Sequence, residues 1–573
     1  MYRQLLWLGL TSAAAAAVLA DTYAQHALTF ETESSKKFKC DLPPSVAPGD
    51  DGFPLASDLF SGNEALERQV ARHGAIVRVP SISFDDMDEV DVDERWDVFL
   101  DLHRVLEQQF PKVHERMTKE IVNRLGLVYT IKGKDESLKP LMLAAHQDVV
   151  PVADPSTWAH PPFSGYFDGT FLWGRGSSDD KNSLTALLSA LEALLSRDDW
   201  TPKRTIVLAF GFDEETSGRR GAGTIAPFLE DRYGKDSMAM ILDEGGMGLQ
   251  VVDDTVYALP AVSEKGHVDI WFELRVLGGH SSIPFPHTGI GIIAEIVHAL
   301  ESHPYEPKLI EGSPVHDHFV CQARYSPHAD RRLTRLVRQG DLKALVKELV
   351  RQGPATHYRL QTSQAVDLVE GGAKINAMPE VVRLGVNYRV APQNSINEVK
   401  RNILKYIRPI VKRYRLDVDA FDGQTFGLGP DELEFGSDDN GDDDGFYYDV
   451  NYNGTLAIWS TQETQPAHTS PTSGKVWDLF SGTIQHTFGS KHRKVVPVGE
   501  LMTGNTDTRH YLDLTRNVYR FVPTRQGESI NIHTVNERID MHSHMDACRF
   551  YYDLVRNFDR SDAGKTSWGY NEL

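Results

Sequence analysis

Acidic residues and a histidine directly follow short apolar runs of the sequence. The runs are 141–145, 205–210 and 238–242, and the residues after them are His146 with Asp148, Glu214 with Glu215, and Asp243. Carboxylates and imidazole together suit Zn²⁺ or a similar divalent cation. Neighbouring glutamates repel one another unless a cation or a proton compensates them. The spacing therefore predicts a metal site, in which Asp148 orients His146 and raises its basicity as a ligand.

A further acidic segment, Trp173-Gly-Arg-Gly-Ser-Ser-Asp-Asp-Lys-Asn182, precedes a helical pattern. Its glycines permit a tight turn that would expose Asp179. The alternative is that an Asp here only caps the following helix, a position that Asp favours. Both readings place the carboxylate at the start of the helix.

The elements that must position these residues read as an α/β domain. Continuous apolar runs are typical of buried strands in a largely parallel sheet, and the helical pattern 183–195 lies between the first two runs. The ends of such strands are where α/β folds bind ligands. Upstream, 66–79 and 99–125 read as helices, and the acidic stretch 85–97 as a solvated loop.

The pattern changes after residue 265. Strand-like runs and amphipathic helices now follow in the order β-α-β-β-α-β, which is typical of a ferredoxin-like unit. These elements are 268–276, 290–300, 365–369, 381–390, 396–407 and 416–420. Within them, 324–352 reads as an additional basic helical insertion, and the acidic stretch 437–445 as a loop. Two strands, 455–459 and 494–498, and a helix, 545–556, complete the chain.

We therefore predict a catalytic α/β domain, with a mostly parallel sheet flanked by helices, that is interrupted by a smaller ferredoxin-like α+β lid domain. The predicted divisions are a signal peptide (1–20), an N-terminal extension (21–55), the catalytic domain in two parts (56–264 and 423–573) and the lid, or dimerisation-type domain (265–422).

The N-terminus resembles a secretory signal. A short basic start precedes the uncharged run Leu5–Ala20, and small residues follow at the expected cleavage positions. The alternative is an N-terminal membrane anchor, although the run is shorter than the roughly 20 residues of a membrane span. We expect a protein of the secretory pathway, either secreted or in the vacuolar lumen.

Composition restricts the function classes. The chain has 573 residues and a net charge of −21, which favours more than one domain and disfavours nucleic-acid binding. The cysteines, Cys40, Cys321 and Cys548, are too few for a disulfide scaffold. One bridge with a free thiol, or two to three buried thiols, both remain open.

An ordered set of segments resembles the di-zinc aminoacylase and carboxypeptidase superfamily of metallopeptidases, and within it the fungal carboxypeptidase S (Gly-Xaa carboxypeptidase) branch. They are Ala145-His-Gln-Asp-Val-Val-Pro151, Trp158-Ala-His-Pro-Pro-Phe-Ser-Gly165, Trp173 to Asn182, Gly211-Phe-Asp-Glu-Glu-Thr-Ser-Gly218, Leu242-Asp-Glu-Gly-Gly246, Leu277-Gly-Gly-His-Ser-Ser-Ile-Pro284, Gly371 to Glu380, Gly504-Asn-Thr-Asp-Thr-Arg-His-Tyr511 and Ile532-His-Thr-Val-Asn-Glu537.

The resemblance implies a site with two Zn²⁺ ions per subunit. In it Asp179 would bridge the metals, with His146 and Asp243 on one, and Glu215 and His533 on the other. Glu214 would be the general base, Asp148 would orient His146, and the Asp179–Asp180 peptide would be cis. The metals would lower the pKa of a shared water, whose proton Glu214 would take and return to the leaving amine.

The residues that bind the substrate are predicted less specifically than the metal ligands. Asn376, Arg389, Asn505 and Arg509 are candidates for the substrate's carboxylate or backbone, since Arg suits a bidentate contact; Arg389 can equally be a salt-bridged strand residue. His280 would stabilise the oxyanion, which requires lid closure or, as in some dimeric relatives, a partner subunit. His542 and His544 also resemble ligands, but the family pattern selects His533.

The predicted function is a zinc-dependent metallocarboxypeptidase that hydrolyses the C-terminal peptide bond of short peptides. The alternative enzyme is an N-acyl-amino-acid hydrolase with the same site. A binding or receptor module on this fold is the non-enzyme alternative, and the complete ligand set argues against it. Expected partners are the peptide or N-acyl amino acid substrate and a second copy of the chain, but no nucleic acid and no stable membrane span.

Overall fold

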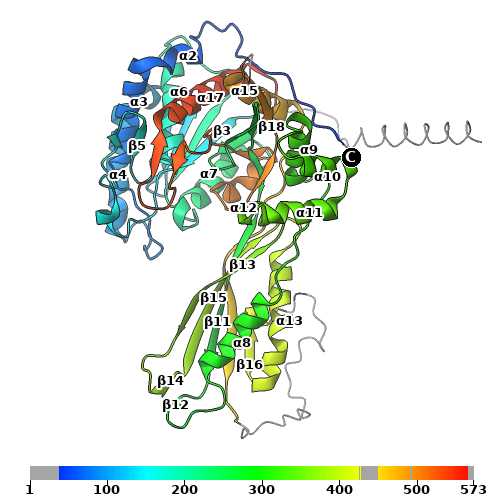
Figure 1. The fold of residues 1–573 in the computed structure, drawn as a ribbon. Helices are drawn as coiled ribbons and strands as arrows, with labels where there is room; N and C mark the ends of the chain where they lie inside the picture. Colours follow the sequence, from blue (N-terminus) through cyan, green and yellow to red (C-terminus); the bar gives the residue numbers. More distant parts are fainter. Residues whose placement is uncertain (1–37, 425, 427–449, 491–492, 566–573) are drawn as a thin grey trace, which may run out of the picture.

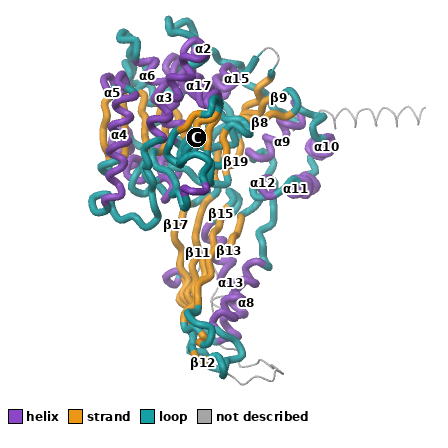
Figure 2. The backbone as a smooth tube through the Cα atoms, turned by 60° about the vertical axis from the view of Figure 1, so that its left-hand side comes forward, coloured by secondary structure: helices purple, strands orange, loops and turns teal. Residues whose placement is uncertain are grey.

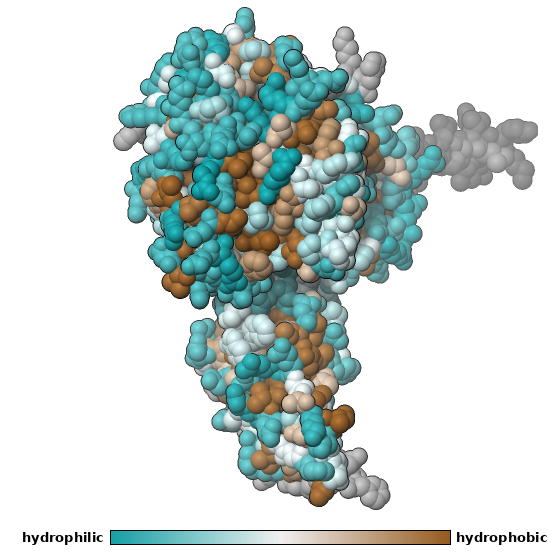
Figure 3. Space-filling model, turned by 90° about the vertical axis from the view of Figure 1, so that its left-hand side faces the viewer, coloured by the Kyte–Doolittle hydropathy of each residue, from teal (hydrophilic) through white to brown (hydrophobic). Residues whose placement is uncertain are grey.

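The computed structural model describes residues 38–424, 426, 450–490 and 493–565. The predicted signal peptide and the acidic loop 437–445 lie outside these residues. In the described part the chain forms a broad upper lobe and a narrower lower lobe that meet at a waist (Figures 1 and 3). No helix among the described residues combines the length and apolarity needed to cross a bilayer.

The upper lobe is built on an eight-stranded sheet. Its spatial order is β1 (Thr118–Val122), β2 (Gly126–Ile131), β6 (Ile206–Gly211), β3 (Leu141–His146), β7 (Met240–Asp243), β20 (Val518–Arg520), β10 (Ala261–Glu264) and β19 (Glu500–Met502). The central pairs β6–β3, β3–β7 and β7–β20 are parallel, whereas β1–β2 and β2–β6 are antiparallel. This confirms the predicted sheet and its three central strands.

Both faces of this sheet are buried, which explains the continuous apolar runs. Leu143 packs on the side of α3 (Gly62–Val77), α6 (Lys181–Leu195), α15 (Lys475–Phe488) and α17 (Met541–Arg560). Met142, one residue earlier, packs on the side of α7 (Ala222–Tyr233) and α16 (Thr508–Tyr511). Successive strand residues face opposite sides, so a sheet covered twice needs an apolar residue at every position.

The predicted helix over 99–125 is confirmed only in its first part. The structure has α4 (Val98–Gln109), α5 (Pro111–Arg116) and then the edge strand β1. Pro111 has no backbone N–H to continue α4 and disfavours helical geometry at the residue before it. Phe110 accordingly leaves the helical region, with φ −130° and ψ 62°.

The lower lobe contains a five-stranded sheet in the order β13 (Ser363–Gly371), β15 (Val381–Val390), β11 (Gly266–Arg275), β17 (Thr455–Thr464) and β16 (Asp417–Ala420). The helices α8 (Gly289–Glu301) and α13 (Ile396–Tyr414) lie together on one side of it (Figure 2). Elements β11, α8, β13, β15, α13 and β16 follow the predicted β-α-β-β-α-β order. A short pair, β12 (Gly279–His280) with β14 (Ala377–Met378), lies at the end far from the upper lobe (Figure 1).

Strand β17 pairs with β11 from Thr455 to Thr464, so the lower sheet extends beyond the predicted division at residue 422. The division predicted from the sequence places this strand in the catalytic domain. The alternation of apolar and polar residues in β17 suits a strand of either lobe's sheet. Only its pairing with β11 shows that it belongs to the lower sheet. The exact division into domains stays a prediction.

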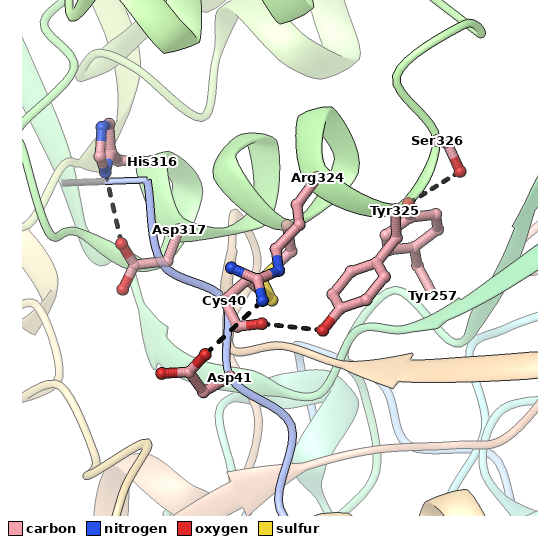
Figure 4. The surroundings of a disulfide bond; sticks show 9 residues. Cys40, Asp41, Tyr257, His316, Asp317, Arg324, Tyr325 and Ser326 are labelled. Carbon is pink, nitrogen blue, oxygen red and sulfur yellow. Dashed lines mark hydrogen bonds and ion pairs between the residues drawn. A yellow bond between two sulfur atoms is a disulfide. The ribbon is translucent and has the colours of Figure 1, made fainter. Parts of the chain in front are cut away.

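The basic insertion is helical, as predicted, and consists of α9 (Pro314–Tyr325), α10 (Arg331–Gln339), α11 (Leu342–Arg351) and α12 (Pro354–His357). Its apolar side shares a core with Leu501 of β19, so it packs on the upper lobe. A disulfide between Cys40 and Cys321 joins α9 to the N-terminal segment (Figure 4). The free thiol, Cys548, is buried.

The remaining elements are short. They are α2 (Ala56–Leu59), the sheet of β18 (Lys494–Pro497), β9 (Thr255–Ala258) and β8 (Leu249–Val252), and the sheet of β21 (Ser529–Ile530), β22 (Arg538–Asp540), β5 (Phe171–Trp173) and β4 (Tyr166–Phe167).

Candidate metal centre

His146 ends strand β3 and is fully buried. Its Nδ1 lies 3.2 Å from Oδ1 of Asp148, as the sequence predicted for an orienting carboxylate. Asp148 does more than this, because its carboxylate also accepts the backbone N–H groups of Glu214 and Glu215, each at 3.1 Å. The hydroxyl of Ser83 donates to it at 2.6 Å. One buried carboxylate therefore positions the imidazole and the glutamate pair together.

Asp179 lies between two histidines. Its Oδ1 is 3.0 Å from Nε2 of His146, and its Oδ2 is 3.2 Å from Nε2 of His533. Burial by itself would raise the pKa of Asp179, but the two histidine contacts hold it well below its ordinary value. The Asp179–Asp180 peptide is cis, as predicted. A carboxylate that presents one oxygen to each imidazole has the arrangement of a bridging ligand.

Glu215 completes the group on the His533 side. Nε2 of His533 lies 3.1 Å from its carboxylate. Burial, together with the nearby charge of Asp179, raises the pKa of Glu215 to about 7. Donor atoms of His146, Asp179 and Glu215 all lie within 4.8 Å of one another.

A second group of donors within 4.8 Å consists of His146, Asp180 and Glu244. The residues of the two groups together are called the metal cluster below. Neither group contains Asp243, the residue predicted as the fifth ligand. Asp243 ends strand β7, and its Oδ1 accepts the backbone N–H of Glu244 at 2.9 Å. Glu244 lies in the bend that follows the strand, and its carboxylate is 3.5 Å from Nε2 of His146. Asp243 stays the predicted ligand, and its neighbour in Asp-Glu-Gly-Gly is a second candidate.

The donor set fits divalent cations. Glu215 and Glu244 are buried carboxylates whose pKa values are raised above the ordinary range, chiefly by burial. Among the described residues, Oδ1 of Asp180 and Oδ2 of Asp243 are buried without a hydrogen-bond partner. Such a concentration of buried carboxylates requires either protons or bound cations. Carboxylate oxygens with imidazole nitrogens are ligands of Zn²⁺ and similar metals.

Glu214 lies beside the cluster without joining either donor group. Burial raises its pKa to about 8. Its carboxylate is 3.4 Å from the guanidinium of Arg509. A carboxyl group with a pKa near neutrality is suited to both accept and return a proton.

Glu537 is a buried carboxylate that ends the motif Ile532–Glu537, and the sequence predicts no role for it. It accepts the backbone N–H groups of Gly176, Ser178 and Asp179 at 2.9 to 3.2 Å. The guanidinium of Arg175 donates to it at 2.6 Å. Because Glu537 is four residues from His533, it connects the loop of one ligand to the loop of another.

The predicted substrate residues fall into two places. Arg389 donates to Asn505 at 3.1 Å and lies close enough to Arg509 and Glu214 to interact with both electrostatically. These residues therefore meet at the junction of the two lobes. His280 and Asn376 instead lie at the β12–β14 pair, at the far end of the lower lobe (Figure 1). The structure does not bring these two to the cluster.

His542 and His544, which the family pattern does not select as metal ligands, lie outside the donor groups. His544 is buried and contacts Asn182 at 2.7 Å and Gln69 at 3.2 Å. His542 is exposed in the first turn of α17, where its backbone N–H donates to the capping residue Asp540. Neither belongs to a donor group among the described residues.

A two-lobed α/β fold with carboxylates and imidazoles gathered at the ends of parallel strands defines a metal-dependent hydrolase. Residues 142–557 match the sequence profile of peptidase family M20/M25/M40, and the chain belongs to this family.

Similar proteins support the same conclusion. Carboxypeptidase S of Saccharomyces cerevisiae is 37% identical over 551 residues, covering 91% of this chain and 88% of its own. The N-fatty-acyl-amino acid synthase/hydrolase of Mus musculus is 28% identical, covering 87% and 89%. The crystal structure of human carnosine dipeptidase 1 shares the fold, with a TM-score of 0.58 at 12% identity and coverage of 89% and 99%.

Proposed function

We propose that this chain is a di-zinc carboxypeptidase that hydrolyses the C-terminal peptide bond of short peptides of the Gly-Xaa type. The observation that carries the proposal is the position of Asp179 between His146 and His533, with Glu214 beside them and two guanidinium groups at the same lobe junction. The similarity to carboxypeptidase S supports this substrate class.

The proposed ligands divide into two sets that share Asp179. His146 and Glu244 would hold one ion, with Glu244 in place of the predicted Asp243, and Glu215 and His533 would hold the other. Two zinc ions bound in this way would lower the pKa of a water molecule and polarise the scissile carbonyl.

The chain's own residues would supply the proton transfers and the binding of substrate. Glu214 would take a proton from the attacking water on its carboxylate and return it to the leaving amine. Arg389 and Arg509 would hold the terminal carboxylate of the substrate, because planar guanidinium groups match it in geometry and charge. A substrate carboxylate there would also give Arg509 a second partner besides Glu214.

His280 keeps its proposed role as an oxyanion donor only if it moves. It lies at the far end of the lower lobe, so the lobe must close or a second copy of the chain must supply the residue. We accordingly propose a homodimer or a closing lower lobe as part of the catalytic cycle.

We further propose that the protein acts in the secretory pathway, either secreted or in the vacuolar lumen. The signal-like N-terminus and the Cys40–Cys321 disulfide support this, because such bonds form in oxidising compartments.

Comparing the hydrolysis of an N-blocked Gly-Leu dipeptide and of an N-fatty-acyl amino acid by the purified protein tests the proposal. A carboxypeptidase cleaves the dipeptide, and a rate on the acyl amino acid alone would overturn the peptide assignment. That second outcome defines the alternative function, which the likeness to the Mus musculus enzyme favours. Digesting a peptide library and measuring the products by mass spectrometry would give the side-chain preference.

A further inference from the structure

A large cavity lies in the helical insertion, in a part of the molecule that the proposed mechanism does not use. Its volume is about 980 Å³, and α9, α10 and the start of α11 line it together with Phe38. This volume is at the upper end of the range for small-molecule sites, about 300–1,000 Å³. None of the lining residues belongs to the metal cluster.

The cavity is apolar inside and basic at its rim. Phe38, Val320, Val337 and Leu342 supply aliphatic and aromatic surface. The rim carries Arg331, Arg335, Arg338, His316 and His328. Glu311 is the only acidic residue among the described residues that line the cavity. A basic rim on this cavity is unusual in a chain with a net charge of −21.

Two of these arginines are available for a ligand. Within the described residues, neither Arg331 nor Arg335 forms an ion pair, and both are exposed. The nearby acids are engaged elsewhere. Asp330 accepts the backbone N–H groups of Arg332 and Leu333 at 2.9 and 2.8 Å, while Glu348 pairs with Arg332 at 2.9 Å.

The wall formed by Phe38 is held in place. The disulfide from Cys40 to Cys321 ties the segment to α9, and the hydroxyl of Tyr325 donates to the carbonyl of Cys40 at 2.9 Å (Figure 4). The guanidinium of Arg338 lies over the ring of Phe38, 5.4 Å from its centre. The cavity is therefore bounded by α10 and by Phe38, whose segment is held to α9 by the disulfide.

We propose that this cavity binds a single long-chain carboxylate, with its acyl chain against the apolar floor and its carboxylate on Arg331 and Arg335. Charge complementarity selects an anion, and the apolar floor selects an aliphatic chain. A monomeric ligand is favoured over an anionic membrane, because an extended surface would meet the repulsion of the chain's overall negative charge. The positive potential of the arginine rim outweighs the overall negative charge only within about 10 Å of the rim, because salt screens it beyond that distance.

Isothermal titration of the full chain with hexadecanoate, below the concentration at which it forms micelles, tests the proposal. We expect saturable binding to this site that weakens at least tenfold in the double variant Arg331→Glu/Arg335→Glu. The matched control is Lys343→Glu/Lys347→Glu, which makes the same change of charge at exposed positions of α11 outside the cavity. Octanoate should bind more weakly, since each covered methylene strengthens binding by up to about fourfold.

Three results would overturn the proposal. The first is no saturable binding, the second is equal affinity in the wild type and in Arg331→Glu/Arg335→Glu, and the third is binding only to phosphatidylglycerol vesicles. Because the substituted arginines are exposed, unfolding of the variant is not expected, and equal melting temperatures would exclude it. Hydrolysis of the dipeptide should be unchanged in both double variants, which separates this test from that of the proposed function.

Discussion

Oε1 of Glu244 lies 3.5 Å from Nε2 of His146, although the two residues belong to different strand ends. The same nitrogen is 3.0 Å from Asp179. Two carboxylates therefore converge on one imidazole nitrogen, and both belong to groups whose donors are close enough to share a cation. This relationship favours Glu244 over Asp243 as the fifth ligand.

Replacing Glu244 by Gln should remove one bound metal per chain and lower kcat by at least a hundredfold. Asp243→Asn should retain both metals, because Oδ1 of Asp243 accepts the backbone N–H of Glu244 and its carboxylate belongs to neither donor group. Elemental analysis of the purified variants, together with their rates on the dipeptide, measures both effects. Loss of metal in Asp243→Asn but not in Glu244→Gln would restore the original assignment.

Glu214→Gln should keep both metals and lose activity by about 10²–10⁴-fold, the usual contribution of a general base. An amide retains the shape of the side chain but cannot accept the water's proton. Metal content and kcat are the measurements, and an unchanged melting temperature would confirm that the fold is intact. Normal turnover by this variant would refute the assignment of the base.

Glu537→Gln should weaken metal binding by about 10–100-fold, as is typical when a group that orients a ligand is removed. The uncharged amide would leave Arg175 without its ion pair and would weaken the contacts to the backbone of the Asp179 loop. Titrating the metal-free protein with zinc gives the affinity. Glu528→Gln, a change in a half-buried ion pair with Arg525, is the matched control and should leave the affinity unchanged. Equal zinc affinity in the two variants would show that Glu537 has no influence on the site.

Much of this site was predictable because its ligands stand at the ends of strands. His146, Glu214 and Glu215 follow apolar runs that are continuous only when both sheet faces are buried, and the sheet then brings the strand ends together. The sequence could not separate Asp243 from Glu244, because adjacent acids differ only in the direction of the side chain, which depends on where the strand ends. The cavity at α10 was not predicted, because it depends on packing between the insertion and an N-terminal segment about 280 residues away in the chain.

The position of His280 relative to the metal cluster also could not be predicted from the sequence. Its motif predicts a role in catalysis, but its distance from the metal cluster depends on the relative position of two lobes. His280→Ala should retain both metals and lower kcat if the residue reaches the substrate during turnover. Metal content and kcat test this, with Lys374→Ala, a change at an exposed residue just before β14, as the control. Unchanged kcat in His280→Ala would remove this residue from the mechanism.

Glu500 makes stability depend on pH. Burial alone would raise its pKa, but Arg359, at 2.6 Å, and His318 lower it below its ordinary value of about 4.5. Because the folded pKa is lowered, the carboxylate's contribution is complete above about pH 4.5 and is lost as the pH falls through the folded pKa. Glu500→Gln should lower the free energy of unfolding by about 3–5 kcal/mol at pH 7.

The difference in unfolding free energy between wild type and Glu500→Gln should narrow in acid, since protonation then removes from the wild type the charge that the variant already lacks. Urea unfolding of the two proteins at pH 7 and pH 4 measures this. A difference that stays constant between these pH values would show that Glu500 is not charged in the folded protein at pH 7.

The Cys40–Cys321 disulfide closes a loop of 281 residues. Cross-links stabilise mainly by restricting the unfolded chain, typically by about 2–4 kcal/mol. Cys40→Ser/Cys321→Ser should therefore lower the melting temperature while leaving kcat on the dipeptide unchanged, because the bond joins the N-terminal segment to α9 and touches no residue of the metal cluster. Adding a reductant should lower the melting temperature of the wild type but not that of the double variant. If the reductant lowered the melting temperatures of wild type and double variant equally, it would act at another site. If the double variant melted at the same temperature as the wild type, the packing of Phe38 against α10 would be enough to hold the N-terminal segment.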